Sequence, residues 1–231
     1  MNNILLIISI IGVFSIMLII KKFLGKEGII GWMGIASILA NLLLIKSIDV
    51  LGISATLGNV LFASNFLATD ILTENYGYKE AKKGVRFGII AVAVFMIVTQ
   101  VALLYVPNSE DVAQSSFELL FSFIPRISLA SISMFALSNF VDIRLYEWLR
   151  KKSNGKKMWL RNNLCTIICN GGENFLFYLI AFLGVMDIGT ILSIALSATI
   201  IEILIALCDT PFLYISKKVK DKKEMLFCKK N

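Results

Sequence analysis

The sequence predicts an all-α integral membrane protein with seven transmembrane helices, and three observations support this fold class. Hydrophobic residues make up 57% of the 231 residues, and the mean hydropathy is +0.79. The apolar residues form seven segments separated by short polar stretches, and most segments are long enough to cross roughly 30 Å of hydrocarbon as a helix. The basic residues gather in alternate polar stretches, a pattern typical of a chain that crosses a membrane repeatedly.

The seven apolar segments leave no room for a separate soluble domain. In chain order they cover residues 4–20, 29–45, 57–73, 87–106, 117–143, 164–185 and 188–215. The first segment has no basic n-region and no small-residue cleavage site before Lys21 and Lys22. We therefore expect a retained helix and not a signal peptide.

The distribution of charge predicts the orientation of the chain. Nearly all of the 23 Lys and Arg residues lie in four stretches, at residues 21–26, 79–86, 144–161 and 217–230. Basic loops remain on the cytoplasmic side of a membrane. The stretches between them contain Asn2 and Asn3, Lys46, Glu110 and Asp111, and Asp187. The N-terminus is therefore expected outside and the C-terminus in the cytoplasm.

The composition argues against several functional classes. The net charge of +7 is distributed as a topology signal beside anionic lipid, so nucleic acid is not expected as a partner. The chain has no histidine, which removes the commonest general base, and it has no GxxxxGK[ST] phosphate loop. We expect no catalytic residues and no cofactor.

The four cysteines do not indicate a disulfide or a metal site. They lie within the last two helices or on their cytoplasmic side, where thiols stay reduced. Cys165 and Cys169 share a helix face, but neither a histidine nor a second cysteine pair accompanies them. They are expected to be packing residues and not metal ligands.

Ionisable residues inside the predicted spans are candidates for a functional site, because charge is costly in lipid. Arg126 lies about 13 Å from the outer end of the fifth predicted helix, and Glu173 lies about 18 Å along the sixth from Arg161. Both fall near the midplane of antiparallel neighbouring helices, so a contact between them is geometrically plausible, and the sequence leaves open whether they pair. The pair could lock two helices together or line a polar cavity. Asn170 and Asn174 flank Glu173 and favour the cavity.

A short internal repeat adds Asn139 and Asp142 to the candidate residues. The pattern R-x-x-L-[AC]-[ST] occurs at residues 126–131 and 161–166, and the pattern [SC]-N-x-x-[DE] occurs at 138–142 and 169–173. Successive antiparallel helices with one polar pattern indicate an inverted pair around a central site. The predicted substrate-binding residues are Arg126, Asn139, Asp142, Asn170, Glu173 and Asn174.

Asp70 and Glu74 share one face of the third predicted helix, close to its cytoplasmic end. One interpretation is a solvated helix end capped by Gly77. The other is a pair of carboxylates that attracts a proton or a cationic solute at the inner mouth or gate. The sequence leaves both interpretations open.

Several motifs give the chain a resemblance to a known family. The most specific is Thr69-Asp70-Ile-Leu-Thr-Glu74-Asn-Tyr-Gly77, with the pattern T-D-I-x-T-E-x-Y-G. It is accompanied by residues 41–46, Arg126 with residues 129–131, Asp142, residues 159–161 with Thr166, and residues 210–214. Over about residues 35–215 the chain resembles the bacterial queuosine precursor transporters, also called the vitamin uptake transporter family.

The resemblance implies uptake of a 7-deazaguanine base, such as preQ0, preQ1 or queuine, across the bacterial cytoplasmic membrane for queuosine modification of transfer RNA. It also implies a six-helix core. The chain then divides into an extra N-terminal helix and loop at residues 1–28, the core at 29–216 and a basic cytoplasmic tail at 217–231. The sixth helix departs from the family pattern at Cys165, Cys169, Asn170, Glu173 and Asn174, so the exact solute stays open.

The chemistry of such a base suits the candidate residues. A guanine-like edge offers N1–H and NH2 side by side to one carboxylate, such as Glu173, and Asn170 or Arg126 could then meet the carbonyl oxygen. The expected partners are the lipid bilayer and the small-molecule solute, with a homodimer and the energy source left open. The alternative is a substrate-binding subunit of an ATP-driven vitamin uptake complex. An intramembrane enzyme is disfavoured, because no histidine accompanies Glu173.

Overall fold

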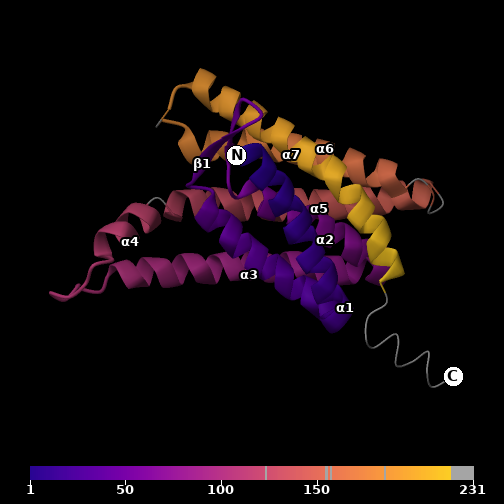
Figure 1. Cartoon of the computed structure of the whole chain (residues 1–231), viewed down its shortest axis with the longest axis horizontal. Helices are drawn as coiled ribbons and strands as arrows, with labels where there is room; N and C mark the ends of the chain where they lie inside the picture. The colour runs from indigo at the N-terminus through magenta and orange to yellow at the C-terminus, as the bar shows by residue number, and fades with distance from the viewer. Residues whose placement is uncertain (123, 154–155, 157, 185, 220–231) are drawn as a thin grey trace.

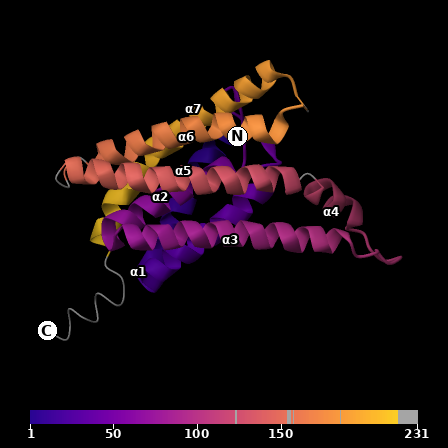
Figure 2. The same ribbon diagram turned by 180° about the vertical axis from the view of Figure 1, so that it is seen from behind.

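The computed structural model describes residues 1–122, 124–153, 156, 158–184 and 186–219. This part of the chain is a bundle of long helices that run roughly side by side, with one small hairpin of strands (Figures 1 and 2). Its elements are α1 (Asn2–Leu43), β1 (Ser47–Val50), β2 (Ile53–Thr56), α2 (Asn59–Tyr76), α3 (Tyr78–Leu103), α4 (Gln114–Phe121), α5 (Ile124–Lys152), α6 (Met158–Phe182) and α7 (Ile188–Lys218).

The first helix, α1, is two antiparallel limbs and not one rod. Its 42 residues would span about 63 Å if straight, roughly twice the thickness of the hydrocarbon layer. At Gly25 the backbone leaves the helical region, with φ 64° and ψ −143°, a conformation that glycine adopts without strain. Asn2 donates to the carbonyl of Asp49, and Leu51 N donates to the side chain of Asn3. The start of α1 therefore lies beside the β1–β2 hairpin that follows its end, as Figure 1 shows.

The central helix of the bundle is α2, which contacts α1, α3, α5 and α7. Five helices of the described chain are long and apolar enough to cross a membrane, namely α1, α3, α5, α6 and α7. The more polar α2 carries buried Ser64, Asn65, Thr69, Asp70 and Thr73. A helix shielded from lipid by its neighbours can carry such side chains, because they meet protein instead of hydrocarbon.

The fifth predicted segment, residues 117–143, is wrong as one continuous helix. The structure divides it into α4 and α5, and α5 begins at Ile124. Pro125 explains the division, because proline has no N–H to donate to the preceding turn and is tolerated in the first turn of a helix. Gln100 Nε2 donates to the carbonyl of Phe121 at 2.9 Å and holds α4 against α3.

The two ends of the bundle differ in charge. At one end Lys26 pairs with Glu80 at 3.4 Å, Lys217 pairs with Glu74 at 2.6 Å, and Lys21 donates to the carbonyl of Ser216. The turn of α1, the α2–α3 junction and the end of α7 thus meet there, on the right in Figure 1.

The opposite end carries the β1–β2 hairpin, the α3–α4 connection and the α6–α7 connection (Figures 1 and 2). Asp187 caps α7 there by accepting a hydrogen bond from Thr190 N at 3.1 Å. Hydrogen bonds from the Thr190 side chain and backbone hold the pKa of Asp187 below its usual value. The four basic stretches, which the sequence predicts to share one side of the membrane, do not lie at this hairpin end. Each has described residues at the end where Lys26, Glu74 and Lys217 lie.

The outer surface of the bundle is apolar. On α1 and α3 the exposed side chains are mostly aliphatic, as at Ile7, Ile11, Ile90, Val94 and Ile97. Exposed apolar surface of this extent marks contact with another apolar phase. In a chain of membrane-crossing helices that phase is the hydrocarbon of the bilayer, so the chain is a multi-pass membrane protein.

Candidate binding site

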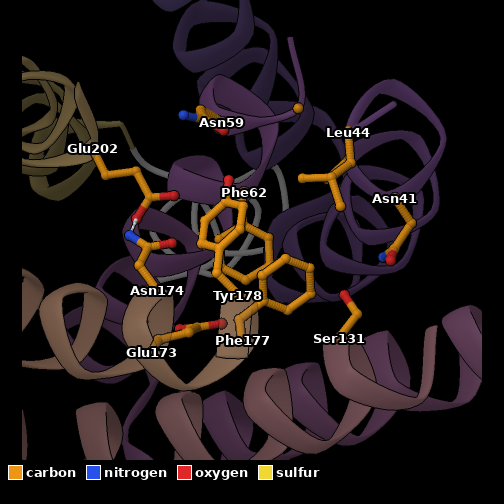
Figure 3. Close-up of a pocket in the computed structure, with 12 residues that line it drawn as sticks. Asn41, Leu44, Asn59, Phe62, Ser131, Glu173, Asn174, Phe177, Tyr178 and Glu202 are labelled. Carbon is orange, nitrogen blue, oxygen red and sulfur yellow. Dashed lines mark hydrogen bonds between the residues drawn. The ribbon is translucent and has the colours of Figure 1, made fainter. Parts of the chain in front are cut away.

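A pocket lies inside the bundle, close to the end that carries the β1–β2 hairpin. It is lined by residues of α1, α2, α5, α6 and α7 and encloses about 40 Å³. Its lining residues are Ala40, Asn41, Leu44, Gly58, Asn59, Phe62, Ser131, Glu173, Asn174, Phe177, Tyr178 and Glu202. We call it the Glu173 pocket. Figure 3 shows polar side chains around a central group of aromatic rings.

Three polar atoms of the Glu173 pocket are buried without a hydrogen-bond partner in the described structure. They are Glu173 Oε2, Asn41 Oδ1 and Asn59 Nδ2, on side chains whose residues are only 5%, 8% and 4% exposed. Buried polar groups are almost always paired, because an unpaired one costs about 1–3 kcal/mol. Two acceptors and one donor facing one pocket indicate a site completed by a polar ligand.

The remaining bonds of these side chains hold them in place. Asn41 Nδ2 donates to the carbonyl of Ser37 at 2.8 Å, and Thr56 donates to Asn59 Oδ1. The Glu173 carboxylate lies beside the hydroxyl of Ser138. Asn41 and Asn59 are thus each anchored through one group, whereas Ser138 Oγ, like Glu173 Oε2, has no hydrogen-bond partner in the described structure.

A second carboxylate, Glu202 of α7, lines the pocket beside Asn174 of α6. Asn174 Nδ2 donates to Glu202 Oε2 at 2.7 Å, the bond drawn in Figure 3. This contact joins α6 to α7 at the level of the pocket. It also orients Asn174 and leaves Glu173 as the α6 carboxylate with an unpaired oxygen.

Aromatic rings supply the flat surface of the pocket. Phe177 and Tyr178 meet edge to face, with ring centroids 5.2 Å apart and planes at 81°. Tyr178 also stacks on Phe182 at 5.9 Å. Phe62 projects from α2 towards the same group in Figure 3. Such rings can cover the face of a planar heterocycle.

The structure brings only part of the predicted site together. Glu173 and Asn174 line the pocket as neighbours on α6. Asn139 and Asn170 belong to α5 and α6, but their side chains lie outside the described part of the structure. Asp142 is buried elsewhere in the bundle, where it accepts a hydrogen bond from Thr69 at 3.0 Å.

The structure does not pair Arg126 with Glu173. Arg126 is exposed and donates to the carbonyls of Ile180 and Leu183, at 3.3 and 2.5 Å, near the end of α6. Because α5 begins at Ile124 and not near residue 117, Arg126 occupies its first turn and not its middle. The side chain therefore caps α6 about two turns from Glu173.

Four polar pocket residues escaped the sequence-based site prediction: Asn41, Asn59, Ser131 and Glu202. Asn41 and Asn59 lie at helix ends, where polar residues are ordinary, so their position gave no signal by itself. Glu202 does lie inside an apolar segment, and the rule that marked Glu173 marks it equally.

Beyond the pocket, towards the basic end, Glu74 is the centre of an ion-pair network. It pairs with Arg161 and with Lys217, and Arg150 Nε lies 4.0 Å from Glu74 Oε1. The Glu74 side chain is only 2% exposed, so a solvated helix end is not what the structure shows. The network joins α2, α5, α6 and α7 and closes this end of the bundle.

The fold and the pocket together define a multi-pass membrane protein with an internal site for a small molecule. A family model described as "Putative vitamin uptake transporter" matches residues 56–216. The chain belongs to this family, whose members are transporters and not enzymes.

Two relatives are similar over much of their length. The chain is 36% identical over 207 residues to the "Probable queuosine precursor transporter" of Bacillus subtilis (strain 168), which covers 89% of this chain and 90% of the relative. It is 27% identical over 144 residues to the "Queuosine precursor transporter" of Escherichia coli (strain K12), which covers 62% of each. No solved structure matches the chain.

Proposed function

We propose that this chain imports a queuosine precursor, a 7-deazaguanine base, across the bacterial cytoplasmic membrane and binds it in the Glu173 pocket. The observation that carries the proposal is the set of three unpartnered polar atoms, on Glu173, Asn41 and Asn59, beside an aromatic wall. The names of the two relatives support the class of solute.

The donors and acceptors of a 7-deazaguanine base complement these three atoms. Its N1–H and exocyclic NH2 lie side by side and suit Glu173, which accepts two bonds as a carboxylate. Its carbonyl oxygen then accepts from Asn59 Nδ2, and its pyrrole N–H donates to Asn41 Oδ1. Phe62 and Tyr178 cover the faces of the ring.

The pocket is contracted in this structure. A volume of about 40 Å³ holds a few water molecules and is too small for two fused rings. Binding of the base therefore requires the aromatic rings that line the pocket, among them Phe62 on α2 and Tyr178 on α6, to move apart. The ion pairs of Glu74 close the cytoplasmic path meanwhile, so the base enters from the outer end.

Asn59 tests the polarity of the pocket. In the Asn59→Asp variant the oxygen that accepts from Thr56 remains, but an acceptor replaces the donor that faces the carbonyl of the base. We expect uptake of the base to weaken about 10-fold or more, since one hydrogen bond is lost and two acceptors face each other. The matched control is Asn108→Asp in the exposed α3–α4 connection, where Oδ1 already acts as an acceptor. Equal uptake by both variants would remove Asn59 from the site.

Seven membrane crossings follow if both limbs of α1 and the shielded α2 are counted with α3, α5, α6 and α7. The basic end of the bundle then faces the cytoplasm, with the N-terminus outside and the C-terminus inside. In this arrangement the first limb of α1 is the extra helix, and residues 29–216 form the six-helix core.

Cysteine labelling tests this topology. In a chain whose native cysteines are replaced by alanine, we expect Glu110→Cys to react with an impermeant maleimide in intact cells. Lys156→Cys, in the α5–α6 connection, should react only after permeabilisation, because the basic end lies in the cytoplasm. Labelling of Lys156→Cys in intact cells would reverse the orientation.

Transfer RNA provides the test of function. Cells that cannot synthesise queuosine precursors, and that lack their own carriers, should regain queuosine when they express this chain and receive nanomolar preQ0, preQ1 or queuine. The base that restores the modification is the solute. A complete lack of queuosine with all three bases, despite normal amounts of the chain in the membrane, would overturn the proposal.

A further inference from the structure

Three buried aspartates form a second cluster between the Glu173 pocket and the ion pairs of Glu74. Asp70 comes from α2, Asp142 from α5 and Asp209 from α7, and they are only 2%, 1% and 1% exposed. Asp70 is close enough to both of the others to feel their charge, and Asp209 feels that of Asp142. The binding of the base in the Glu173 pocket makes no use of this cluster.

The neighbouring hydrogen bonds do not satisfy all three carboxylates. Thr69 Oγ1 donates to Asp142 Oδ2 at 3.0 Å, and Asn162 Nδ2 donates to Asp209 Oδ1 at 2.5 Å. Asp70 Oδ1, by contrast, is buried in the cluster with no hydrogen-bond partner in the described structure. A buried carboxylate oxygen without a partner, on a residue that interacts with two other carboxylates, lacks the hydrogen bond that a proton would supply.

The charged groups around Asp70 do not neutralise the cluster. Glu74 adds a negative charge from α2 itself, and Arg161 on α6 is the one cation among the groups that act on Asp70 in the described structure. Arg161 is already paired with Glu74. Three anionic carboxylates that interact in a water-poor interior would repel one another, so at least one must carry a proton or meet a cation.

The other surroundings of α2 near the cluster are neutral or weakly acidic. Tyr146 of α5 feels the charge of Asp70, and so do Cys165 and Cys169 of α6. On the α1 side, α2 meets the neutral side chains of Trp32 and Ser37. On the α3 side, Gly84 lies against Leu72.

The cluster is electrostatically linked to the pocket. Glu173 on α6 feels the charge of Asp142 on α5, and Cys169, one turn before Glu173 on α6, interacts with both carboxylates. Glu173 must be ionised to accept two bonds from a base. An ionised Glu173 repels negative charge on Asp142 and so favours a proton in the cluster, which makes binding of base and proton cooperative.

We propose that the Asp70–Asp142–Asp209 cluster binds a proton that crosses the membrane together with the base, so that the carrier is a proton symporter. This inference rests on the proposed function. A proton suits the site better than a metal ion, since the described residues contain no group of three or more His, Cys, Asp and Glu arranged to hold one.

Purified chain in lipid vesicles that contain a fluorescent pH indicator tests the proposal. The solute is preQ0, which is neutral, so that any charge or proton movement belongs to the carrier. Addition of preQ0 outside should acidify the interior of wild-type vesicles, and an acidic exterior should accelerate net uptake at least several-fold. The Asp70→Asn variant, which mimics the protonated side chain, should exchange labelled for unlabelled preQ0 but neither acidify the interior nor respond to the gradient. Glu110→Gln, an exposed carboxylate in the α3–α4 connection, is the matched control and should behave as wild type.

The outcomes separate the symporter from the proposed function. Uptake of preQ0 by the wild type without acidification, or uptake driven by a sodium gradient, would overturn the proton site and leave the importer intact. No exchange of preQ0 by the wild type would overturn both. If Asp70→Asn fails to fold, Asp209→Asn takes its place, and the wild-type acidification decides the question without any variant.

Discussion

The Glu173→Gln variant is expected to lose most of its uptake, with binding of the base weakened about 100-fold. The carboxylate accepts two hydrogen bonds from the base, whereas an amide offers one acceptor and turns two N–H donors towards the donors of the ligand. Charge-assisted bonds of this kind contribute about 1.5–3 kcal/mol each, so loss of one and repulsion at the other account for the size of the effect.

The measurement is uptake of labelled base into cells that contain equal amounts of each variant in the membrane. Glu110→Gln makes the same chemical change at an exposed position and should retain full uptake. Glu173→Asp is expected to fall between the two, because it keeps the charge but shortens the reach. Undiminished uptake by Glu173→Gln would show that the base binds elsewhere.

The Arg161→Met variant is expected to lose about 3 kcal/mol of stability, the usual cost of removing one partner of a buried ion pair. Arg161 is 2% exposed and pairs with Glu74 on α2. It also donates to Ser153 Oγ at 3.1 Å and to the carbonyl of Lys156 at 2.5 Å, which closes the α5–α6 connection. Removal of the guanidinium takes a hydrogen-bond donor from each of these acceptors and leaves Glu74 with Lys217 at 2.6 Å and Arg150 at 4.0 Å.

Thermal unfolding of the purified chain in detergent measures this loss. Arg144→Met makes the same change on the exposed side of α5 and should unfold at the wild-type temperature. A double variant, Arg161→Met with Glu74→Gln, should recover part of the stability, because it no longer buries an undercompensated charge. Equal unfolding temperatures for Arg161→Met and Arg144→Met would show that the network contributes no stability.

The all-α membrane fold could be predicted from hydropathy and charge. The polar interval with Lys21, Lys22 and Lys26 separates the first two predicted segments, and the structure reverses the chain at Gly25 within it. The extent of α4 and α5 could not be predicted in this way. Residues 117–143 are predominantly apolar. Pro125 restricts the backbone locally, and a hydropathy average over a window does not register that restriction.

The part of the candidate site that could be predicted from the sequence lies on α6 and, by the same rule, at Glu202 on α7. Glu173 and Asn174 are polar residues inside an apolar segment, which is an informative departure from the surrounding pattern. Asn41 and Asn59 reach the pocket because the β1–β2 hairpin brings the end of α1 beside the start of α2, and no periodicity reveals that pairing. Arg126 was predicted too deep in the membrane because its depth was measured from residue 117, whereas α5 begins seven residues later, at Ile124.

Exchange of labelled 7-deazaguanine base by the purified chain in lipid vesicles tests the central claim most directly, since nothing else in the system can carry or modify the base. Vesicles loaded with unlabelled base should accumulate external label, and excess guanine should compete because it shares the N1–H, NH2 and carbonyl edge, whereas adenine should not. Accumulation in wild-type vesicles and its absence with Glu173→Gln is the expected result. Wild-type vesicles that exchange no more label than protein-free vesicles would contradict the account.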